Sequence, residues 1–135
     1  ASLLFQSDIE CDYIKSIDID PACESIANMM NKKEEMEGKF KAVTSNMCNF
    51  KTDADIVVNT STEHITQNEY NAWIDRIPES SLLVLQSNNY RIPEHVRTAE
   101  NLEDFIQQSD IDVFWSGELD LPLYKRFMII GKKHV

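Results

Sequence analysis

The chain has 135 residues, of which 42% are hydrophobic and 27% are charged, a composition typical of a folded globular protein. Thirteen basic and 23 acidic residues give a net charge of -10, so a nucleic-acid backbone or an anionic membrane would repel the molecule. We therefore expect neither nucleic acid nor a membrane as partner. The length fits one domain over residues 1–135 and is too short for two independent domains.

The three cysteines are odd in number and show no C-x-x-C spacing, so they indicate neither a disulfide framework nor a zinc site. The acids and histidines also lack metal-ligand spacing, and we expect no metal site. No apolar run approaches the roughly 20 residues that span a bilayer, and the N-terminus does not resemble a signal peptide. These features predict a cytoplasmic protein.

The first half of the chain predicts a strand, a helix and a second strand. The β-rich residues 13–20 precede Pro21, and Asp20 as N-cap with Pro21 at the first helical position predicts a helix start. The helix should end at Gly38, and its apolar stripe consists of Ala22, Ile26, Met29 and Met30. A strand over 40–43 then leads into a polar loop over 44–49.

The second half continues the alternation of strands and helices. The apolar run 54–58 is typical of a strand in a sheet covered on both faces, and Thr66 to Glu69 forms a capping box at a helix start. The further predicted elements are a strand over 81–86, a helix over 101–108 and strands over 112–115 and 126–131. This order predicts an α/β fold with an antiparallel edge.

Polar side chains follow the predicted strands, at the edge where open α/β sheets bind ligands. Asp18 could accept hydrogen bonds from both hydroxyls of a ribose, or it could simply be solvated, and Asp20 could serve only as the helix cap. Asn46 and Met47 could hold the edge and face of a base, or form a plain polar loop.

A second polar group follows the strand over 54–58. His64 is a candidate general base because its reference pKa lies near neutrality, although the polar residues around it could instead organise the turn into the next helix. Another amide-rich loop, over 86–90, follows the strand over 81–86, and Tyr124 precedes the last strand. His95 and His134 are expected at the surface.

Five motifs, taken in order, resemble the class I, Rossmann-like S-adenosylmethionine-dependent methyltransferases. The resemblance covers nearly the whole chain from Tyr13 onward, and the residues that carry it are Ser16–Pro21, Asn46–Met47, Asp55–His64, Leu83–Asn88 and Arg126–Gly131. It implies a three-layer α/β sandwich with a mostly parallel sheet, an antiparallel strand near the C-terminus and S-adenosylmethionine as cofactor.

The resemblance also implies roles for individual residues. Asp18, with Ile19 beside it, would bind the cofactor ribose, Asn46 and Met47 would hold the adenine, and Asn59 and Thr60 would flank the methionine part. The family usually has an aspartate where Asn46 stands, so the adenine contact would be made by an amide. Candidate bases for the reaction are His64 and Tyr124, and candidate substrate contacts are Glu63, Gln86 and Asn88.

The chain departs from the family pattern at its start. The family's first strand carries a G-x-G-x-G loop that the cofactor approaches closely, but the three glycines here are isolated. Residues 1–9 are interpreted as the end of the helix that follows this loop. We therefore expect an N-terminally incomplete, truncated domain, in which the strands containing Ile17 and Val57 each have an unpaired edge.

The leading functional hypothesis is transfer of a methyl group from S-adenosylmethionine to a small polar acceptor molecule. The alternative is a non-catalytic, methyltransferase-like interaction module or a truncated fragment without cofactor binding, which would cover its strand edges by forming a homo-oligomer. A weaker alternative is another nucleotide-binding α/β enzyme such as a dehydrogenase, which would also need a glycine loop.

Overall fold

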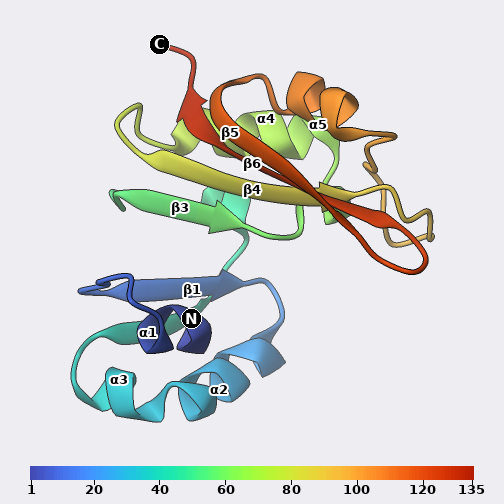
Figure 1. The fold of residues 1–135 in the computed structure, drawn as a ribbon. Coiled ribbons are helices and arrows are strands. Elements are labelled where there is room, and N and C mark those ends of the chain that lie inside the picture. Colours follow the sequence, from blue (N-terminus) through green and yellow to red (C-terminus); the bar gives the residue numbers. More distant parts are fainter. The chain divides into compact units, whose positions relative to one another are not determined.

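The computed structural model describes all residues from Ala1 to Val135 and divides into two compact units, Ala1–Phe50 and Lys51–Val135. Figure 1 labels the helices and strands of both units. The expectation of one domain over residues 1–135 stays a prediction. None of the helices is both long and apolar enough to cross a membrane.

The first unit is built on two parallel strands. Strand β1 (Ile14–Asp18) pairs with β2 (Phe40–Thr44), and both run in register from their first to their last residue. Helix α2 (Pro21–Met30) packs against both strands, and α3 (Lys32–Met36) packs against β2. The predicted N-terminal helical segment is present as α1 (Ser2–Gln6).

The predicted start of α2 is confirmed, but the prediction of one continuous helix to Gly38 is wrong. Asp20 caps α2 by accepting a hydrogen bond from Ala22 N at 2.9 Å. Asn31 then interrupts the helix: its backbone leaves helical geometry while its side chain donates to Ala27 O at 2.8 Å, a local bond that competes with helix continuation. Gly38 follows α3 with a φ of 76°, which favours glycine.

The second unit contains a four-stranded sheet in the order β3-β4-β6-β5. Its strands are β3 (Ile56–Asn59), β4 (Leu82–Asn88), β5 (Ile111–Asp120) and β6 (Lys125–Lys133). Strand β3 is parallel to β4, whereas β6 is antiparallel to both β4 and β5. The predicted α/β fold with a reversed strand near the C-terminus is confirmed.

Strands β4 and β5 are longer than the sequence predicts. The prediction of a loop from Gln86 is wrong, because residues up to Asn88 pair with β6, where Gln86 faces Met128 and Asn88 faces Arg126. Strand β5 likewise continues to Asp120 because it forms a hairpin with β6. Polar residues join these strands because a partner strand satisfies their backbone groups.

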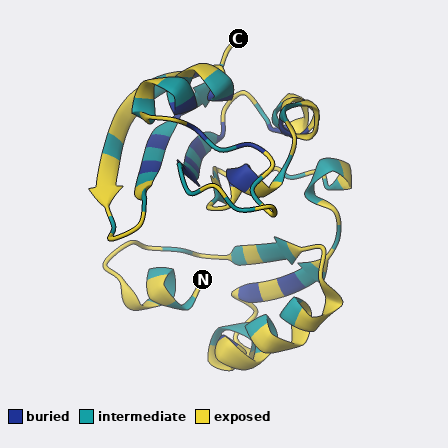
Figure 2. Cartoon of the chain, turned by 90° about the vertical axis from the view of Figure 1, so that its right-hand side faces the viewer, coloured by how far each residue is buried: buried dark blue, intermediate teal, exposed yellow.

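The core of the second unit lies between the sheet and two helices, α4 (Gln67–Arg76) and α5 (Leu102–Ser109). Leu85 of β4 and Ile129 of β6 face each other in register and are fully buried, as the dark blue bands of the strands in Figure 2 illustrate. From α5, Phe105 places its ring 6.5 Å from that of Phe127. Phe105 of α5 therefore packs against the sheet. The apolar stripe predicted for the helix of the first unit is wrong, because Ile26, Met29 and Met30 are exposed at 55%, 76% and 66%.

The two helices of this unit are joined at a buried hydrogen bond. The predicted capping box is present at the start of α4, where the side chains of Thr66 and Glu69 each accept the other's backbone N–H at 3.2 Å. One turn further, the hydroxyl of Tyr70 donates to the carbonyl of Ser109, at the end of α5, at 2.6 Å. This bond fixes α4 relative to α5.

Stability should depend on pH through Tyr70. Burial raises the pKa of Tyr70 to about 12, above its ordinary value of 10.0. The folded state therefore keeps the proton longer than the unfolded chain, so this stabilisation is present below pH 10 and is lost as the pH rises toward 12. The expected loss is about 2 to 3 kcal/mol.

The measurement for Tyr70 is urea unfolding of the natural chain and of the Tyr70→Phe variant between pH 8 and 12. Tyr70→Phe should be less stable at pH 8 because Ser109 O loses its donor, and the difference should shrink above pH 10. A difference that stays constant over this range would contradict the buried, neutral state of this phenol.

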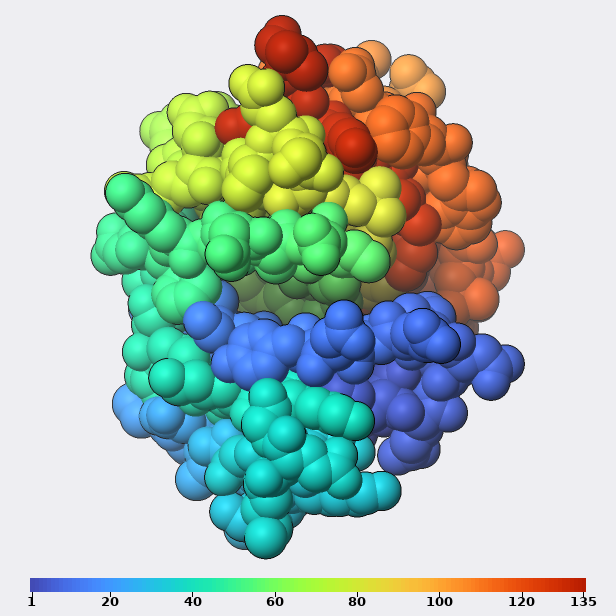
Figure 3. All heavy atoms as spheres, turned by 90° about the vertical axis from the view of Figure 1, so that its left-hand side faces the viewer, coloured from blue at the N-terminus to red at the C-terminus, as the bar shows by residue number.

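Each unit contains a strand with an unpaired edge, as predicted. Strand β1 pairs only with β2 within its sheet, and β3 pairs only with β4 within its own. On β3, Ile56 and Val58 are about half exposed, at 52% and 50%, and the atoms of this strand (green) lie at the surface in Figure 3. An apolar strand with a free edge can pair with a further strand.

Candidate functional site

The carboxyl ends of β1 and β2 bring together the predicted cofactor residues of the first unit. The backbone carbonyl of Asp18 accepts a hydrogen bond from Ser45 N at 2.9 Å, so the residue after β2 lies beside the end of β1. The Asp18 carboxylate is exposed, and its Oδ1 accepts from Asp20 N at 2.9 Å. The neighbouring Ile19 is 68% exposed. The fold thus presents an oriented carboxylate with an apolar side chain beside it.

Asn46 and Met47 follow β2 at the same end of the sheet. Asn46 caps the 3-10 turn η1 (Met47–Asn49) by accepting a hydrogen bond from Cys48 N on its Oδ1 at 2.9 Å. This bond orients the side chain, so its amide nitrogen is the group left to donate to a ligand. A contact between this amide and adenine stays a prediction.

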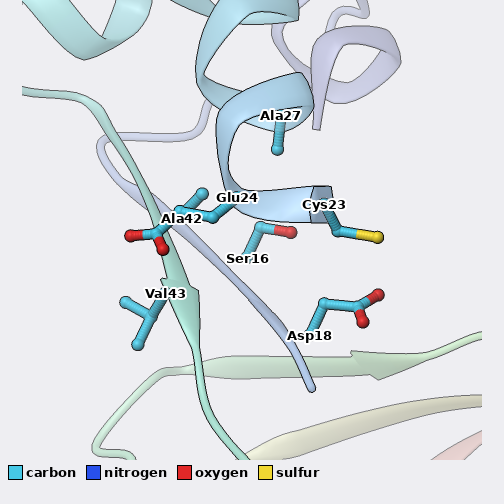
Figure 4. A pocket seen from close by; sticks show the side chains of 7 residues that line it. All are labelled: Ser16, Asp18, Cys23, Glu24, Ala27, Ala42 and Val43. Carbon is cyan, nitrogen blue, oxygen red and sulfur yellow. The ribbon is translucent and has the colours of Figure 1, made fainter. Parts of the chain in front are cut away.

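A small cavity lies between α2 and the two strands of the first unit (Figure 4). Its volume is about 50 Å³, room for a few water molecules at most. The residues that line it are Ser16, Asp18, Cys23, Glu24, Ala27, Ala42 and Val43. Desolvation and the charge of Asp18 raise the pKa of the Cys23 thiol, so this cysteine is no activated nucleophile. This cavity is therefore too small to hold a nucleoside.

In the second unit, the polar segment after β3 is tied to β4. Asn59 accepts a hydrogen bond from Ser61 N on its Oδ1 at 3.0 Å, while Thr60 is exposed. The fully buried Thr62, in the 3-10 turn η2 (Thr62–His64), donates from its hydroxyl to Gln86 O at 2.7 Å. The polar residues around His64 thus form an ordered turn, which was one of the two alternatives from the sequence. The segment also exposes polar groups at the end of β3.

Gln86 and Asn88 each hold neighbouring parts of the chain. Gln86 accepts a hydrogen bond from the guanidinium of Arg126 at 3.0 Å on its Oε1. Asn88 is 2% exposed, its Oδ1 accepts from Tyr90 N at 3.0 Å, and its backbone carbonyl accepts from Ala99 N at 3.1 Å. These contacts give both side chains a structural role, and their contact with a substrate stays a prediction.

Four ring side chains connect the two predicted catalytic residues. His64 lies edge-on to His95 with ring centroids 4.7 Å apart, His95 lies edge-on to Tyr90 at 6.1 Å, and Tyr90 stacks on Tyr124 at 5.0 Å. We call these four residues the aromatic row. Although sixty residues separate them in sequence, His64 and Tyr124 thus belong to one cluster at the surface of the second unit.

The position of His95 corrects the expectation that it is a plain surface residue. It is half-buried, and its Nδ1 lies 2.6 Å from the carbonyl oxygen of Tyr90. The segment that carries it is held against η2 by a hydrogen bond from Arg97 N to Glu63 O at 3.1 Å. No periodic pattern marks this irregular segment, so sequence analysis had no means of placing it beside His64.

Arg97 is a second residue that sequence analysis missed. Its guanidinium lies 4.3 Å above the ring of Tyr70, donates to Gln67 Oε1 at 2.9 Å and approaches Thr62 O at 3.4 Å. Burial lowers the pKa of Arg97, while the nearby Tyr70 and Glu63 oppose this shift, and an arginine in this setting stays charged. Arg97 therefore places a positive charge beneath η2.

No known family model matches the chain, and no curated protein matches it either. Solved structures do match. Magnesium protoporphyrin IX methyltransferase from Synechocystis PCC 6803, solved with bound SAH, is 12% identical with a TM-score of 0.68, over 90% of this chain and 64% of that protein. The chain thus spans less than two thirds of that enzyme's length.

Two further methyltransferases show the same likeness. Geranyl diphosphate C-methyltransferase from Streptomyces coelicolor A3(2) is 7% identical with a TM-score of 0.71, over 98% of this chain and 68% of that protein. The N-methyltransferase NodS from Bradyrhizobium japonicum WM9 is 12% identical with a TM-score of 0.67, over 96% of this chain and 79% of that protein. The chain therefore has the class I, Rossmann-like α/β fold of S-adenosylmethionine-dependent methyltransferases.

Proposed function

We propose that the protein binds S-adenosylmethionine and transfers its methyl group to a small polar acceptor. The observation that carries the proposal is the pair formed by the Asp18 carboxylate and the Asn46 amide. Asp18 ends β1 and Asn46 follows β2, so both lie at the carboxyl ends of adjacent parallel strands, where this fold class binds its ligands. Methyltransferases of this fold that were solved with bound SAH or SAM support the choice of cofactor.

The first unit would contribute the nucleoside contacts. Asp18, whose Oδ1 is oriented by Asp20 N, would accept hydrogen bonds from the ribose hydroxyls. Asn46 would donate from its amide to the adenine edge, and the side chains of Ile19 and Met47 would pack against the adenine face. Because Asn46 is an amide where the family usually has a carboxylate, the contact with adenine would be made by an uncharged side chain.

The second unit would contribute the chemistry of transfer. The sulfonium of S-adenosylmethionine is already a strong electrophile, so the protein must align donor and acceptor and remove a proton. Asn59 and Thr60 would flank the methionine part of the cofactor. The base would be His64, whose Nδ1 faces the carbonyl of Glu94 at 3.1 Å and leaves Nε2 unprotonated, or Tyr124 in the aromatic row.

The polarity of the second unit supports the proposed acceptor class. Glu63 offers a carboxylate beside His64, while Gln86 and Asn88 offer amides at the end of β4. The net charge of -10 favours a polar or cationic small molecule over nucleic acid. We therefore propose a small polar acceptor bound beside Glu63 and Gln86, while Asn88, which is 2% exposed, would act by holding the chain at Tyr90.

Cofactor affinity should fall when Asp18 is replaced by alanine. Loss of charged hydrogen bonds to ribose is expected to weaken binding of S-adenosylmethionine by about 1 to 3 kcal/mol, roughly 5- to 150-fold. Equilibrium dialysis with labelled S-adenosylmethionine measures this change in the full chain. Asp12→Ala removes the same charge from an exposed position before β1 and should leave the affinity unchanged. Equal affinities of the Asp18 and Asp12 variants would remove Asp18 from the cofactor site.

A second candidate function is a non-catalytic interaction module. The observation that favours it is the unpaired edge of both β1 and β3, together with the lack of a G-x-G-x-G motif in the sequence. This candidate predicts no cofactor binding and an oligomer that covers the strand edges. A monomer by light scattering that binds S-adenosylmethionine would exclude it.

A further inference from the structure

Three side chains at one end of the aromatic row bring metal-ligating atoms together. Glu63 and His64 belong to η2, and His95 comes from the irregular segment between β4 and α5. One ligand atom from each of the three lies within 4.8 Å of the other two. The fold therefore assembles a group of two imidazoles and one carboxylate that the sequence keeps apart.

The two imidazole rings are held in a state that suits metal binding. In His64, Nδ1 faces the carbonyl oxygen of Glu94 at 3.1 Å, and in His95 it faces that of Tyr90 at 2.6 Å. A carbonyl can only accept a hydrogen bond, so each Nδ1 is the donor, and in the neutral ring Nε2 then offers its lone pair to a metal ion. Metal-ligating histidines characteristically donate their other ring N–H in this way.

The carboxylate of Glu63 provides a separate indication of a ligand. Its side chain is 5% exposed, and Oε1 lies 3.7 Å from His64 Nε2. The second oxygen, Oε2, is buried without a hydrogen-bond partner. Arg97 attracts the carboxylate electrostatically, but its guanidinium donates to Gln67 Oε1 and Thr62 O. A buried carboxylate oxygen without a partner is costly, and a bound cation would remove that cost.

We propose that Glu63, His64 and His95 bind a divalent transition-metal ion of the zinc type through the Glu63 carboxylate and the two Nε2 atoms. Three protein ligands with an open fourth position are typical of zinc sites that exchange water or substrate. Imidazole ligands favour zinc, copper or nickel over magnesium or calcium. His64, with 46% of its side chain exposed, gives the ion access from solvent.

Metal binding does not depend on the cofactor, because none of the three ligands and none of the carbonyl groups that orient them is a proposed cofactor contact. With metal bound, His64 Nε2 is a ligand and cannot act as the base, so the base would be Tyr124 or a metal-bound water. Failure of S-adenosylmethionine binding would therefore leave this proposal intact, and failure of zinc binding would leave the proposed transferase function intact.

The test is calorimetric titration of the metal-free full chain with Zn²⁺, in the absence of S-adenosylmethionine. We expect one zinc ion per chain, at least tenfold weaker binding to His95→Ala, and a similar loss in Glu63→Gln. The control is His134→Ala, which removes an exposed histidine paired with Asp112 at 2.8 Å and should not change the affinity. Circular dichroism checks that each variant is folded. If Glu63→Gln does not fold, His95→Ala still tests the site, because it removes only a half-buried ring.

The three free cysteines could also bind zinc, so the titration is repeated on a sample whose thiols have been alkylated. The alkylated protein should still bind one zinc ion. The visible spectrum of the Co²⁺-loaded chain should show a tetrahedral ion with nitrogen and oxygen ligands rather than thiolate. No stoichiometric binding, binding lost on alkylation, or unchanged affinity in the folded His95→Ala variant would overturn the proposal.

Discussion

Replacing Gly131 with alanine is expected to destabilise the second unit by about 3 kcal/mol or more. A Cβ at this position in β6 would lie 2.1 Å from the carbonyl oxygen of Asp112 and 2.9 Å from its carbonyl carbon. Both atoms belong to the backbone of β5, next to a register shift between Val113 and Trp115 that leaves Phe114 as an extra residue. The clash can be relieved only if the two strands move apart.

Urea unfolding of the full chain measures this effect. The matched control is Gly117→Ala in β5, where the Cβ would meet the end of the Trp115 side chain at 2.7 Å. That ring is 51% exposed and can rotate away, so the control should change stability little. Equal unfolding midpoints for the two alanine variants would contradict the close approach of β5 to Gly131.

Replacing Arg97 with alanine is expected to cost about 3 to 5 kcal/mol of stability. The substitution removes the guanidinium from the ring of Tyr70, 4.3 Å away, and removes the donor to Gln67 Oε1. It also leaves the buried carboxylate of Glu63 without its nearby positive charge. Each of these losses acts in a low-dielectric environment, where it is large.

The control for this prediction lies in the same segment of the chain. Arg91 forms an ion pair with Glu100 at 3.6 Å in which both side chains are at least 75% exposed, so Arg91→Ala should change stability by less than about 0.5 kcal/mol. Arg97→Lys should recover only part of the lost stability, because an ammonium group cannot stack on Tyr70 and donate to both Gln67 Oε1 and Thr62 O as the planar guanidinium does. Similar stabilities of Arg97→Ala and Arg91→Ala would show that the Arg97 contacts contribute nothing.

Most elements of the fold could be predicted from the sequence because local rules determine them. The Asp20-Pro21 pair gives the start of α2 and the Thr66 to Glu69 box gives the start of α4. One error arose where a distant partner decides the structure: strand β4 extends through Asn88 because β6 pairs with it. The other arose locally, because the Asn31 side chain competes for the carbonyl of Ala27 and breaks the helix.

The candidate site was predictable only in part, for the same reason. Asp18 and Asn46 could be located because polar residues after parallel strands meet at one edge of a sheet. His95 and Arg97 lie in a segment without periodicity, and only the folded chain shows that one faces His64 and the other Tyr70. The lack of metal-ligand spacing in the sequence thus says nothing about ligands from separate segments.

The central claim is that this chain binds the methyltransferase cofactor, and calorimetric titration with S-adenosylhomocysteine tests it most directly. The product analogue lacks the transferable methyl group, so binding is measured without any acceptor. We predict one saturable site per chain, accompanied by a rise in the unfolding temperature. A folded chain that releases no heat and shows no thermal shift at millimolar S-adenosylhomocysteine would contradict the claim and favour the interaction module.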